Sequence, residues 1–388
     1  MYNAIDEFSV AESGESSTSH SHRSRHRINR MRKTFRQVKD FFTPKVIHSL
    51  SGILFLIFVA LLLWLSLIVT VVNRLHIPLP NNGLQQILKR YTPPNETHAA
   101  DPTWVDDFSS DVLPVSCHSH NDYLHRVPLY EGLAAGCIST EADIWPRNNS
   151  LRNGELDLLV SHTSKRLKET RTLRSLYLDP LMNILQRQND NSSSTTAGVF
   201  SMSPNASLTL LLDFKETDNI TFDLVSQQLE PFRAANWLTY WTPTTGITER
   251  PITIVATGSA PFDRIISNTT YRDIFYDAPI DNLSNNQYHA NNSYYASGSL
   301  RRAVGLAAFG HLTAKQEDTA RSQVQLAEGL GLKTRYWDTP SWPISFRNKI
   351  WSALEELGVR VLNVDDLTAA TRWDWRMCVV GGLVICDG

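Results

Sequence analysis

An apolar run from Ile53 to Val72, which contains no charged residue, constrains how this chain can fold more than any other feature. No Asp, Glu, Lys or Arg lies between Lys45 and Arg74. A helix of about 20 apolar residues crosses the ~30 Å hydrocarbon core of a bilayer. A buried helix of a globular protein would normally carry a polar stripe, and a signal peptide would be shorter and closer to Met1. The sequence therefore predicts a transmembrane helix over residues 50–74, with residues 53–72 in the membrane.

The residues on either side of this run predict its orientation. Residues 22–36 are rich in arginine, and the positive-inside rule places such a segment in the cytosol. Asn-X-Ser/Thr sequons occur only after the run, at Asn95, Asn148, Asn191, Asn205, Asn219, Asn268, Asn282 and Asn291. This one-sided distribution is typical of a glycosylated lumenal or extracellular domain. We therefore expect a single-pass type II membrane protein of the secretory pathway or cell surface.

Composition divides the rest of the chain into three parts. Residues 1–45 are rich in Ser, His and Arg and predict a disordered, basic cytosolic tail. Residues 75–110 contain several Pro and Asn residues and predict a stalk or linker. Residues 111–388 form the candidate folded domain. The formal net charge of the whole chain is -2, so bulk charge gives no reason to expect a nucleic-acid partner.

All four cysteines lie beyond the predicted membrane helix, where disulfides can form: Cys117, Cys137, Cys378 and Cys386. Cys378 and Cys386 are close enough in sequence to join the C-terminal tail into a loop. Cys117 and Cys137 lie near two predicted strands and could be buried thiols instead. The sequence alone leaves the pairing open.

Short apolar runs alternate with helical patterns beyond residue 111, which favours a parallel sheet. The predicted strands are 113–117, 137–144, 156–161, 208–214, 252–256, 274–277, 304–309, 333–337 and 359–364. The clearest predicted helices are 129–135, 222–235, 315–330 and 348–357. Nine strands over this length fit an α/β fold with a (β/α)8 TIM barrel and one extra strand. A doubly wound sheet is the main alternative.

Polar residues follow the predicted strands, where a barrel places its catalytic groups. They are His118 and His120, Glu141 and Asp143, His162, Asp213 and Lys215, Asp277, Trp337, and Asp365 and Asp366. Glu141 and Asp143 are two residues apart, so they share one face of a strand and suit a hard divalent cation. Histidines beside such a cation can act as general acid and base. Asp277, Asp365 and Asp366 are more simply explained as residues that begin turns.

The order of these motifs resembles the phospholipase C-like phosphodiesterase superfamily, with its glycerophosphodiester phosphodiesterase and spider-type sphingomyelinase D branches. The motifs are a strand ending in His, then E-x-D, then Ser161-His162, then Leu-Leu-Leu-Asp213-Phe-Lys215. Together with HSHNDY, STEADIW, YDAP, YWDTP and LNVDDL, they are also similar to a fungal group named "altered inheritance of mitochondria protein 6". The resemblance covers roughly residues 112–370.

The resemblance implies a role for each matching position. It implies that His118 and His162 are the catalytic histidines, and that Lys215 is a catalytic lysine that pairs with phosphate or ligand. It implies that Glu141, Asp143 and Asp213 bind a divalent cation, Mg²⁺ or Ca²⁺. It implies that Trp337 lines the substrate cleft. His120 has no equally firm counterpart and competes with His118 for the catalytic role, or hydrogen-bonds within the turn. Asn121 is a candidate substrate contact.

The sequence departs from the resembled superfamily at a position that bears on the choice of substrate. The glycerophosphodiesterase branch usually has His-Arg-Gly at the first strand, where this chain has Ser119 after His118. The resulting hypothesis is a membrane-anchored, metal-dependent phosphoric diester hydrolase acting on a lipid or lipid-derived phosphodiester. The alternative is a catalytically inactive barrel that binds a lipid headgroup or glycan. A glycosidase with Glu141 and Asp143 as its acid pair fits less well, because glycosidases place their carboxylates across the substrate.

Overall fold

The computed structural model describes residues 44–75, 112–189, 196–307, 311–371, 378–380 and 383–385. The chain divides into two units, one ending at Leu75 and one beginning at His76. In the first unit, helix α2 spans Pro44–Leu75, and its segment His48–Val69 has a mean hydropathy of 3.0 with no buried surface. This helix is long and apolar enough to be a membrane anchor. The predicted tail and stalk lie almost wholly outside the described residues.

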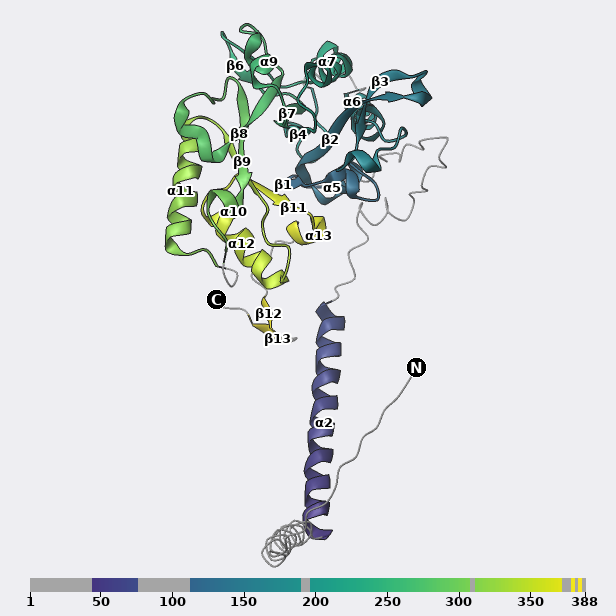
Figure 1. Ribbon diagram of the computed structural model, residues 1–388, viewed down its shortest axis with the longest axis vertical. Helices are drawn as coiled ribbons and strands as arrows, with labels where there is room; N and C mark the ends of the chain where they lie inside the picture. The colour runs from purple at the N-terminus through teal and green to yellow at the C-terminus, as the bar shows by residue number, and fades with distance from the viewer. Residues whose placement is uncertain are drawn as a thin grey trace, which may run out of the picture. The chain divides into compact units, whose positions relative to one another are not determined.

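The second unit is built on a nine-stranded sheet in the order β1-β11-β10-β9-β8-β7-β4-β2-β3 (Figure 1). Its strands are β1 Val115–Ser119, β2 Cys137–Asn149, β3 Glu155–Val160, β4 Leu208–Phe214, β7 Ile252–Gly258, β8 Ile274–Pro279, β9 Ser293–Ser299, β10 Lys333–Trp337 and β11 Val361–Val364. All neighbours pair in parallel except β2 and β3. Because β1 pairs with both β11 and β2, eight parallel strands close into a barrel. The predicted TIM barrel is confirmed.

Helices cover the barrel and bury its outer face. They are α5 Tyr130–Ala135, α6 Asp179–Asn189, α7 Asn219–Gln228, α8 Glu230–Ala234, α9 Phe262–Ser267, α10 Leu300–Ala303, α11 Ala314–Gly329, α12 Ile344–Glu356 and α13 Leu367–Ala370. Strand β4 is buried along almost its whole length, as expected for a parallel strand with helices outside and a packed lumen inside. Two small antiparallel pairs complete the fold, β5 Tyr240–Thr242 with β6 Gly246–Thr248 and β12 Cys378–Val380 with β13 Leu383–Ile385.

Short turns of 3₁₀ or π helix occupy several loops. They are η1 Asp122–Leu124, η2 Ser150–Arg152, η3 Ser164–Arg166, η4 Arg174–Leu178 and η5 Ile280–Asn285. Two of them, η1 and η3, lie directly after the β1 and β3 strands, whose ends carry the predicted histidines. These loops therefore shape the mouth of the barrel.

Two strands show how the prediction compares with the structure. The predicted strand at 304–309 is wrong, because its described residues 304–307 form a turn and irregular chain, and the barrel strand missing from the prediction is β9, Ser293–Ser299. The prediction followed the apolar residues of 304–309. The true strand β9 has the sequence SYYASGS, which is less apolar because the strand faces a polar lumen. The second strand, β3, is the predicted extra strand. It pairs antiparallel with β2 and lies outside the closed barrel.

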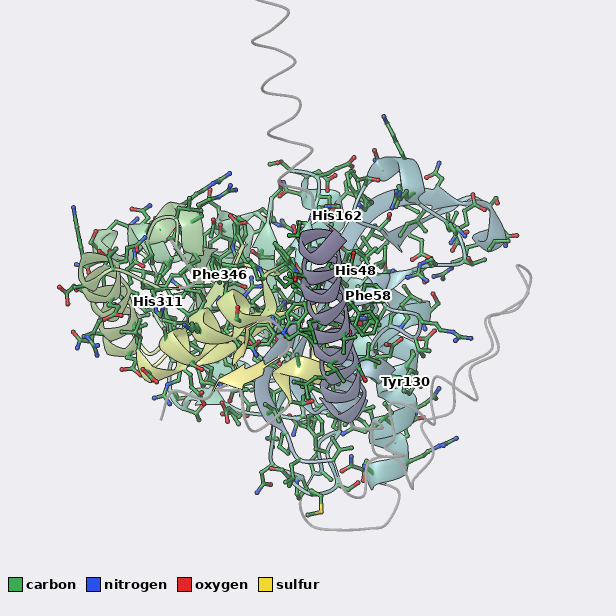
Figure 2. All side chains as sticks on the ribbon, turned by 90° about the horizontal axis from the view of Figure 1, so that it is seen from below. His48, Phe58, Tyr130, His162, His311 and Phe346 are labelled. Atoms are coloured by element: carbon green, nitrogen blue, oxygen red, sulfur yellow. A yellow bond between two sulfur atoms is a disulfide. The ribbon has the colours of Figure 1, made fainter. Side chains whose placement is uncertain are left out.

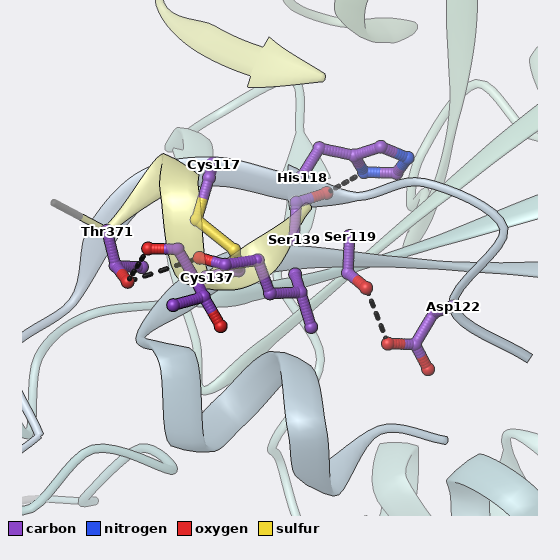
Figure 3. The surroundings of a disulfide bond; sticks show 9 residues. Cys117, His118, Ser119, Asp122, Cys137, Ser139 and Thr371 are labelled. Carbon is purple, nitrogen blue, oxygen red and sulfur yellow. Dashed lines mark hydrogen bonds between the residues drawn. A yellow bond between two sulfur atoms is a disulfide. The ribbon is translucent and has the colours of Figure 1, made fainter. Parts of the chain in front are cut away.

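A disulfide joins Cys117 of β1 to Cys137 of β2 (Figure 3). The alternative of two buried thiols at these positions is therefore wrong. Both residues are buried beside α13, in a small apolar cluster that includes Trp351 and Leu367. The Cys378 side chain and Cys386 lie outside the described residues, so their predicted pairing stays a prediction.

Candidate functional site

Three carboxylates meet at the carboxyl ends of two neighbouring barrel strands. Glu141 and Asp143 lie on β2, and Asp213 lies near the end of β4 directly opposite Asp143 in the strand register. One oxygen from each of the three lies within 4.8 Å of the others. Glu141 and Asp143 are buried. Because residues two apart on a strand share a face, β2 presents both of its carboxylates to the same point in space.

The charges at this point are only partly balanced by protein groups. The Lys215 ammonium lies 2.6 Å from Oδ2 of Asp213 and 2.8 Å from Oδ2 of Asp143. Oδ1 of Asp143 is buried and has no hydrogen-bond partner among the described residues. Burial raises the pKa of Asp213 to about 6, with Lys215 opposing the shift and Asp143 adding to it. Clustered carboxylates with an unpartnered buried oxygen fit a hard divalent cation.

His118 is completely buried at the end of β1. Its Nδ1 lies 2.7 Å from Oγ of Ser139 (Figure 3), and its Nε2 lies 3.4 Å from Oε2 of Glu141. Burial, helped by the positive charge of Arg335, lowers its pKa to about 4. The imidazole is therefore neutral, with Nε2–H donating to Glu141 and Nδ1 accepting from the Ser139 hydroxyl. This arrangement orients Glu141 but leaves His118 no exposed atom.

His120, two residues later, has a different environment. Its side chain is 27% exposed, its Nδ1 lies 2.7 Å from Oδ1 of Asp365, and its Nε2 lies 3.9 Å from Oε2 of Glu141. Burial opposes protonation, but the hydrogen bond to Asp365 and the charge of Glu141 outweigh it and raise the pKa of His120. Asp365 directly follows β11, where the sequence suggested only a turn residue. The structure instead places Asp365 against an accessible histidine.

Asn121 and Tyr123 fill the space between the histidines. Asn121 has a left-handed backbone with φ of 50°, and its N–H donates to Oε2 of Glu141 at 2.9 Å. The Tyr123 hydroxyl donates to Oδ2 of Asp143 at 2.7 Å, lies 3.1 Å from Nδ1 of His162 and contacts the Asn121 side-chain oxygen. Burial and the neighbouring Asp143 raise the pKa of Tyr123, so it stays a protonated donor. Sequence reasoning missed Tyr123, although it ends the HSHNDY motif.

His162, labelled in Figure 2, lies in the loop after β3 and approaches the carboxylate group through Asp143. Its Nδ1 is 3.3 Å from Oδ2 of Asp143, and its side chain is 58% exposed. His120 and His162 thus approach different members of the group, Glu141 and Asp143. All predicted site residues except Trp337 belong to this one contact network. Trp337 ends β10, is partly exposed, and is paired in the strand register with Ser299.

A second polar group, which the sequence did not predict, fills the lumen beside this network. Arg335 of β10 is buried and donates to Ser297 at 3.1 Å, to Asn363 at 2.7 Å and to Asp277 at 3.2 Å. Asp277 was expected to begin a turn, but it is buried in the barrel and also accepts a hydrogen bond from Thr257. The alternation Lys-Thr-Arg-Tyr-Trp in β10 was the available signal, since it turns Lys333, Arg335 and Trp337 to one face.

Comparison with known proteins places this geometry in a family. A family model described as "AIM6-like phosphodiesterase domain" matches residues 106–277, which include the three carboxylates, His118, His120, His162 and Lys215. A protein of Arthroderma benhamiae named "Altered inheritance of mitochondria protein 6 homolog" is 35% identical over 277 residues, which are 68% of this chain and 85% of that protein. The chain belongs to the altered inheritance of mitochondria protein 6 family.

Other members of the altered inheritance of mitochondria protein 6 family match over a similar span. The protein of Eremothecium gossypii is 36% identical over 274 residues, 66% of this chain and 68% of its own length. That of Saccharomyces cerevisiae is 33% identical over 291 residues, 69% of this chain and 73% of its own length. No solved structure gives a significant match to the chain. The matching family model describes a phosphodiesterase-type domain over residues 106–277, which cover the first five strands of the sheet.

Proposed function

We propose that this protein is a membrane-anchored, metal-dependent phosphoric diester hydrolase. One observation carries the proposal: three carboxylate oxygens lie within 4.8 Å of one another, and two accessible histidines approach the group from different carboxylates. Binding alone needs a cation or anion site, whereas a pair of histidines suits proton transfer in both directions. The phosphodiesterase-type domain of the family supports the same reaction class.

Glu141, Asp143 and Asp213 would hold Mg²⁺ or Ca²⁺, because carboxylate oxygens are the ligands that both ions prefer. The clearest ligand atom for such a cation is Oδ1 of Asp143, which is buried and has no hydrogen-bond partner among the described residues. A bound cation supplies charge neutralisation for the nonbridging phosphate oxygens. Lys215 already contacts two of the three carboxylates, so its ammonium adds positive charge at the same place.

His120 and His162 divide the proton transfers in this proposal. One histidine takes the proton of the attacking hydroxyl, from water or from a neighbouring hydroxyl of the substrate. The other gives a proton to the oxygen that leaves as the P–O bond breaks. His118 was the first choice from the sequence, but it is fully buried and hydrogen-bonded at both nitrogens. We therefore assign His118 the positioning of Glu141.

Three further residues have supporting roles. The Tyr123 hydroxyl connects Asp143 with His162 and fixes the distance between them. Asn121 donates its backbone N–H to Glu141 and holds the turn that carries His120. Trp337 is the candidate aromatic contact for the substrate, because it ends a barrel strand at the same edge and is partly exposed.

The substrate in this proposal is a lipid or a lipid-derived phosphodiester on the extracytoplasmic side of a membrane. The apolar helix α2 would keep the barrel near a lipid surface. The disulfide between Cys117 and Cys137 supports an oxidising compartment, where such bonds persist. The one-sided sequons support the same topology.

The full-length protein in detergent micelles tests this function against the alternative of an inactive headgroup- or glycan-binding barrel. Glycerophosphodiesters, lysophospholipids and sphingomyelin are each incubated with Mg²⁺, with Ca²⁺ or with a chelator. We expect cation-dependent turnover of at least one class, and its loss in Asp143→Asn and His162→Ala. Full activity of a folded His162→Ala protein would overturn the assignment. Cation binding without turnover of any phosphodiester would favour the inactive barrel.

A further inference from the structure

A pocket of about 450 Å³ lies beside the carboxylate site, and Tyr123 is the one residue of its lining that has a role in the proposed reaction. It is formed by the η1 turn after β1 and by the loop after β3. Its lining residues are Tyr123, Leu124, His125, Val160, Ser161, Lys165, Arg166, Leu167, Lys168 and Arg171. We refer to this set as the basic pocket, because four of its members are Lys or Arg and none is Asp or Glu.

Three of the four cations of the basic pocket lack the ion pairs that some other cations of the barrel have. Lys165, Arg166 and Lys168 are exposed, and none forms an ion pair with another described residue. Arg147, by contrast, is paired with Glu216 at 2.6 Å, and Arg233 with Asp273 at 2.6 Å. Like charges gathered around one concave surface repel each other and create a local positive potential. An anion bound among them would relieve that repulsion.

One further group of the basic pocket, Arg171, can contact such an anion. Arg171 donates a hydrogen bond to the backbone carbonyl of Tyr123, which fixes its guanidinium at the pocket wall. Guanidinium N–H groups bind phosphate oxygens through charge-assisted hydrogen bonds. The chemistry of the pocket therefore suits a phosphate group.

The basic pocket is directly connected to the carboxylate site. Tyr123 belongs to both, since its hydroxyl contacts Asp143 and its carbonyl faces Arg171. Ser161 lines the pocket, and the next residue, His162, approaches Asp143. A ligand with one phosphate at the carboxylate site can therefore place a second anionic group near the pocket without leaving this edge of the barrel.

We propose that the basic pocket binds a phosphate group, either the second phosphate of the phosphodiester substrate or free inorganic phosphate. The first source rests on the proposed function, and the second does not. Both sources present the same tetrahedral anion to Lys165, Arg166 and Lys168. Position 119 is Ser, so it supplies no positive charge for a phosphate. A substrate of this site would therefore gain affinity from a separate cationic contact.

The first experiment measures binding without catalysis. Isothermal titration calorimetry follows inorganic phosphate binding to the full-length protein in detergent micelles, with a chelator present to keep the carboxylate site free of cations. We expect Lys165→Gln/Lys168→Gln to weaken binding about tenfold, since each lost contact is solvent-screened. The matched control is Lys315→Gln/Arg321→Gln on α11, whose side chains are also exposed. No binding to the wild type, or equal binding by both double variants, would overturn the proposal.

The second experiment identifies the source of the phosphate. Two glycerophosphodiesters that differ only in an added phosphate monoester on the alcohol are compared by kcat/KM. If the second phosphate comes from the substrate, Lys165→Gln/Lys168→Gln lowers kcat/KM for the phosphorylated substrate about tenfold and leaves the other unchanged. If phosphate binds as a free ion, the ratio of kcat/KM between the two substrates is the same in the double variant as in the wild type. Calorimetry still shows weaker phosphate binding by the double variant. Failure of all turnover with intact phosphate binding would contradict the proposed function alone.

Discussion

Nδ1 of His120 lies 2.7 Å from Oδ1 of Asp365, so a histidine from the first barrel strand is oriented by a carboxylate that follows the last. With Nδ1–H donating to this carboxylate, Nε2 faces the carboxylate site, 3.9 Å from Oε2 of Glu141 and 3.2 Å from the Asn121 side-chain nitrogen. The two residues are 245 positions apart in sequence and are brought together because β1 and β11 are neighbours. Closing the barrel therefore completes the acid–base group.

This pairing predicts unequal effects of substitutions at His120 and at Asp365. We expect His120→Gln to lower kcat by about 10²–10⁴, the usual contribution of a general acid or base. We expect Asp365→Asn to lower kcat less and to shift the pH profile of kcat toward lower pH, because the Asp365 hydrogen bond raises the pKa of His120. His289→Gln is the control, since this histidine lies in a distant loop after η5. A His120→Gln protein with unchanged kcat would return the catalytic role to His118.

Removal of the cation should abolish activity without unfolding the barrel. We expect chelation to eliminate turnover and Mg²⁺ or Ca²⁺ to restore it, because Lys215 alone cannot balance three carboxylates. Circular dichroism of the chelated protein should keep its far-ultraviolet spectrum. Glu141→Gln and Asp213→Asn should each weaken cation binding, measured by calorimetry. Cation-independent turnover by the chelated wild type would contradict the metal assignment.

Gly258 offers a steric test of the same site. A Cβ at Gly258 would overlap Oδ1 of Asp213, and the backbone there has a φ of +68°. We expect Gly258→Ala to displace Asp213 and to reduce cation affinity and kcat at least tenfold. Gly154→Ala is a matched control, because Gly154 has a φ of +77° but no atom within 4 Å of the added Cβ. Equal cation affinity in the two variants would show that Asp213 is not a ligand.

The pKa of Asp213 predicts how cation binding depends on pH. Burial raises this pKa to about 6, so a proton competes with the cation below that value. A raised carboxyl pKa also means that Asp213 destabilises the metal-free protein progressively as pH rises from the ordinary carboxyl pKa, about 4, to about 6, and a bound cation removes this cost. We therefore expect the increase in Tm caused by Ca²⁺ or Mg²⁺ to grow between pH 5 and pH 7, by differential scanning fluorimetry. An increase that is constant with pH would contradict this assignment.

The sequence predicts the barrel well where strands are apolar on both faces. Strand β4, with its Leu-Thr-Leu-Leu-Leu core, was recognised to the residue. Strand β9 was missed because its inward side chains are Ser and Tyr, which serve the polar lumen around Arg335. Hydrophobic periodicity reports burial in an apolar environment, so a strand that faces hydrogen-bonding groups gives little signal.

The candidate site was predictable where its residues are close in sequence, and less so where the fold joins distant segments. Glu141 and Asp143 share a strand face, which follows from their spacing alone. The contact of His120 with Asp365 depends on barrel closure, and the burial of His118 depends on the helices and strands around β1. Neither can be read from local spacing. Asp277 looked like a turn residue because its pairing with Arg335 spans 58 positions.

Loss of the disulfide should destabilise the domain. Closing a loop of about this length contributes roughly 3 kcal/mol to the free energy of unfolding. We expect Cys117→Ser/Cys137→Ser to lower that free energy by a similar amount, measured by urea denaturation of the full-length protein. Treatment of the wild type with a reductant should give the same change. Unchanged stability in both cases would mean that Cys117 and Cys137 are not bonded in solution.

The disulfide also makes one part of the mouth of the barrel a covalent ring. Cys117 and Cys137 are 20 positions apart, and the chain between them carries His120, Asn121 and Tyr123. These three residues therefore stay on a closed cycle even when the surrounding hydrogen bonds open transiently. Amide hydrogen exchange in this cycle should be slower than in the loop after β3, which holds His162 without a covalent closure. The Cys117–Cys137 bond must therefore form during biosynthesis for the residues at the mouth of the barrel to be held in place. Protein for the experiments above is best produced through a secretory pathway.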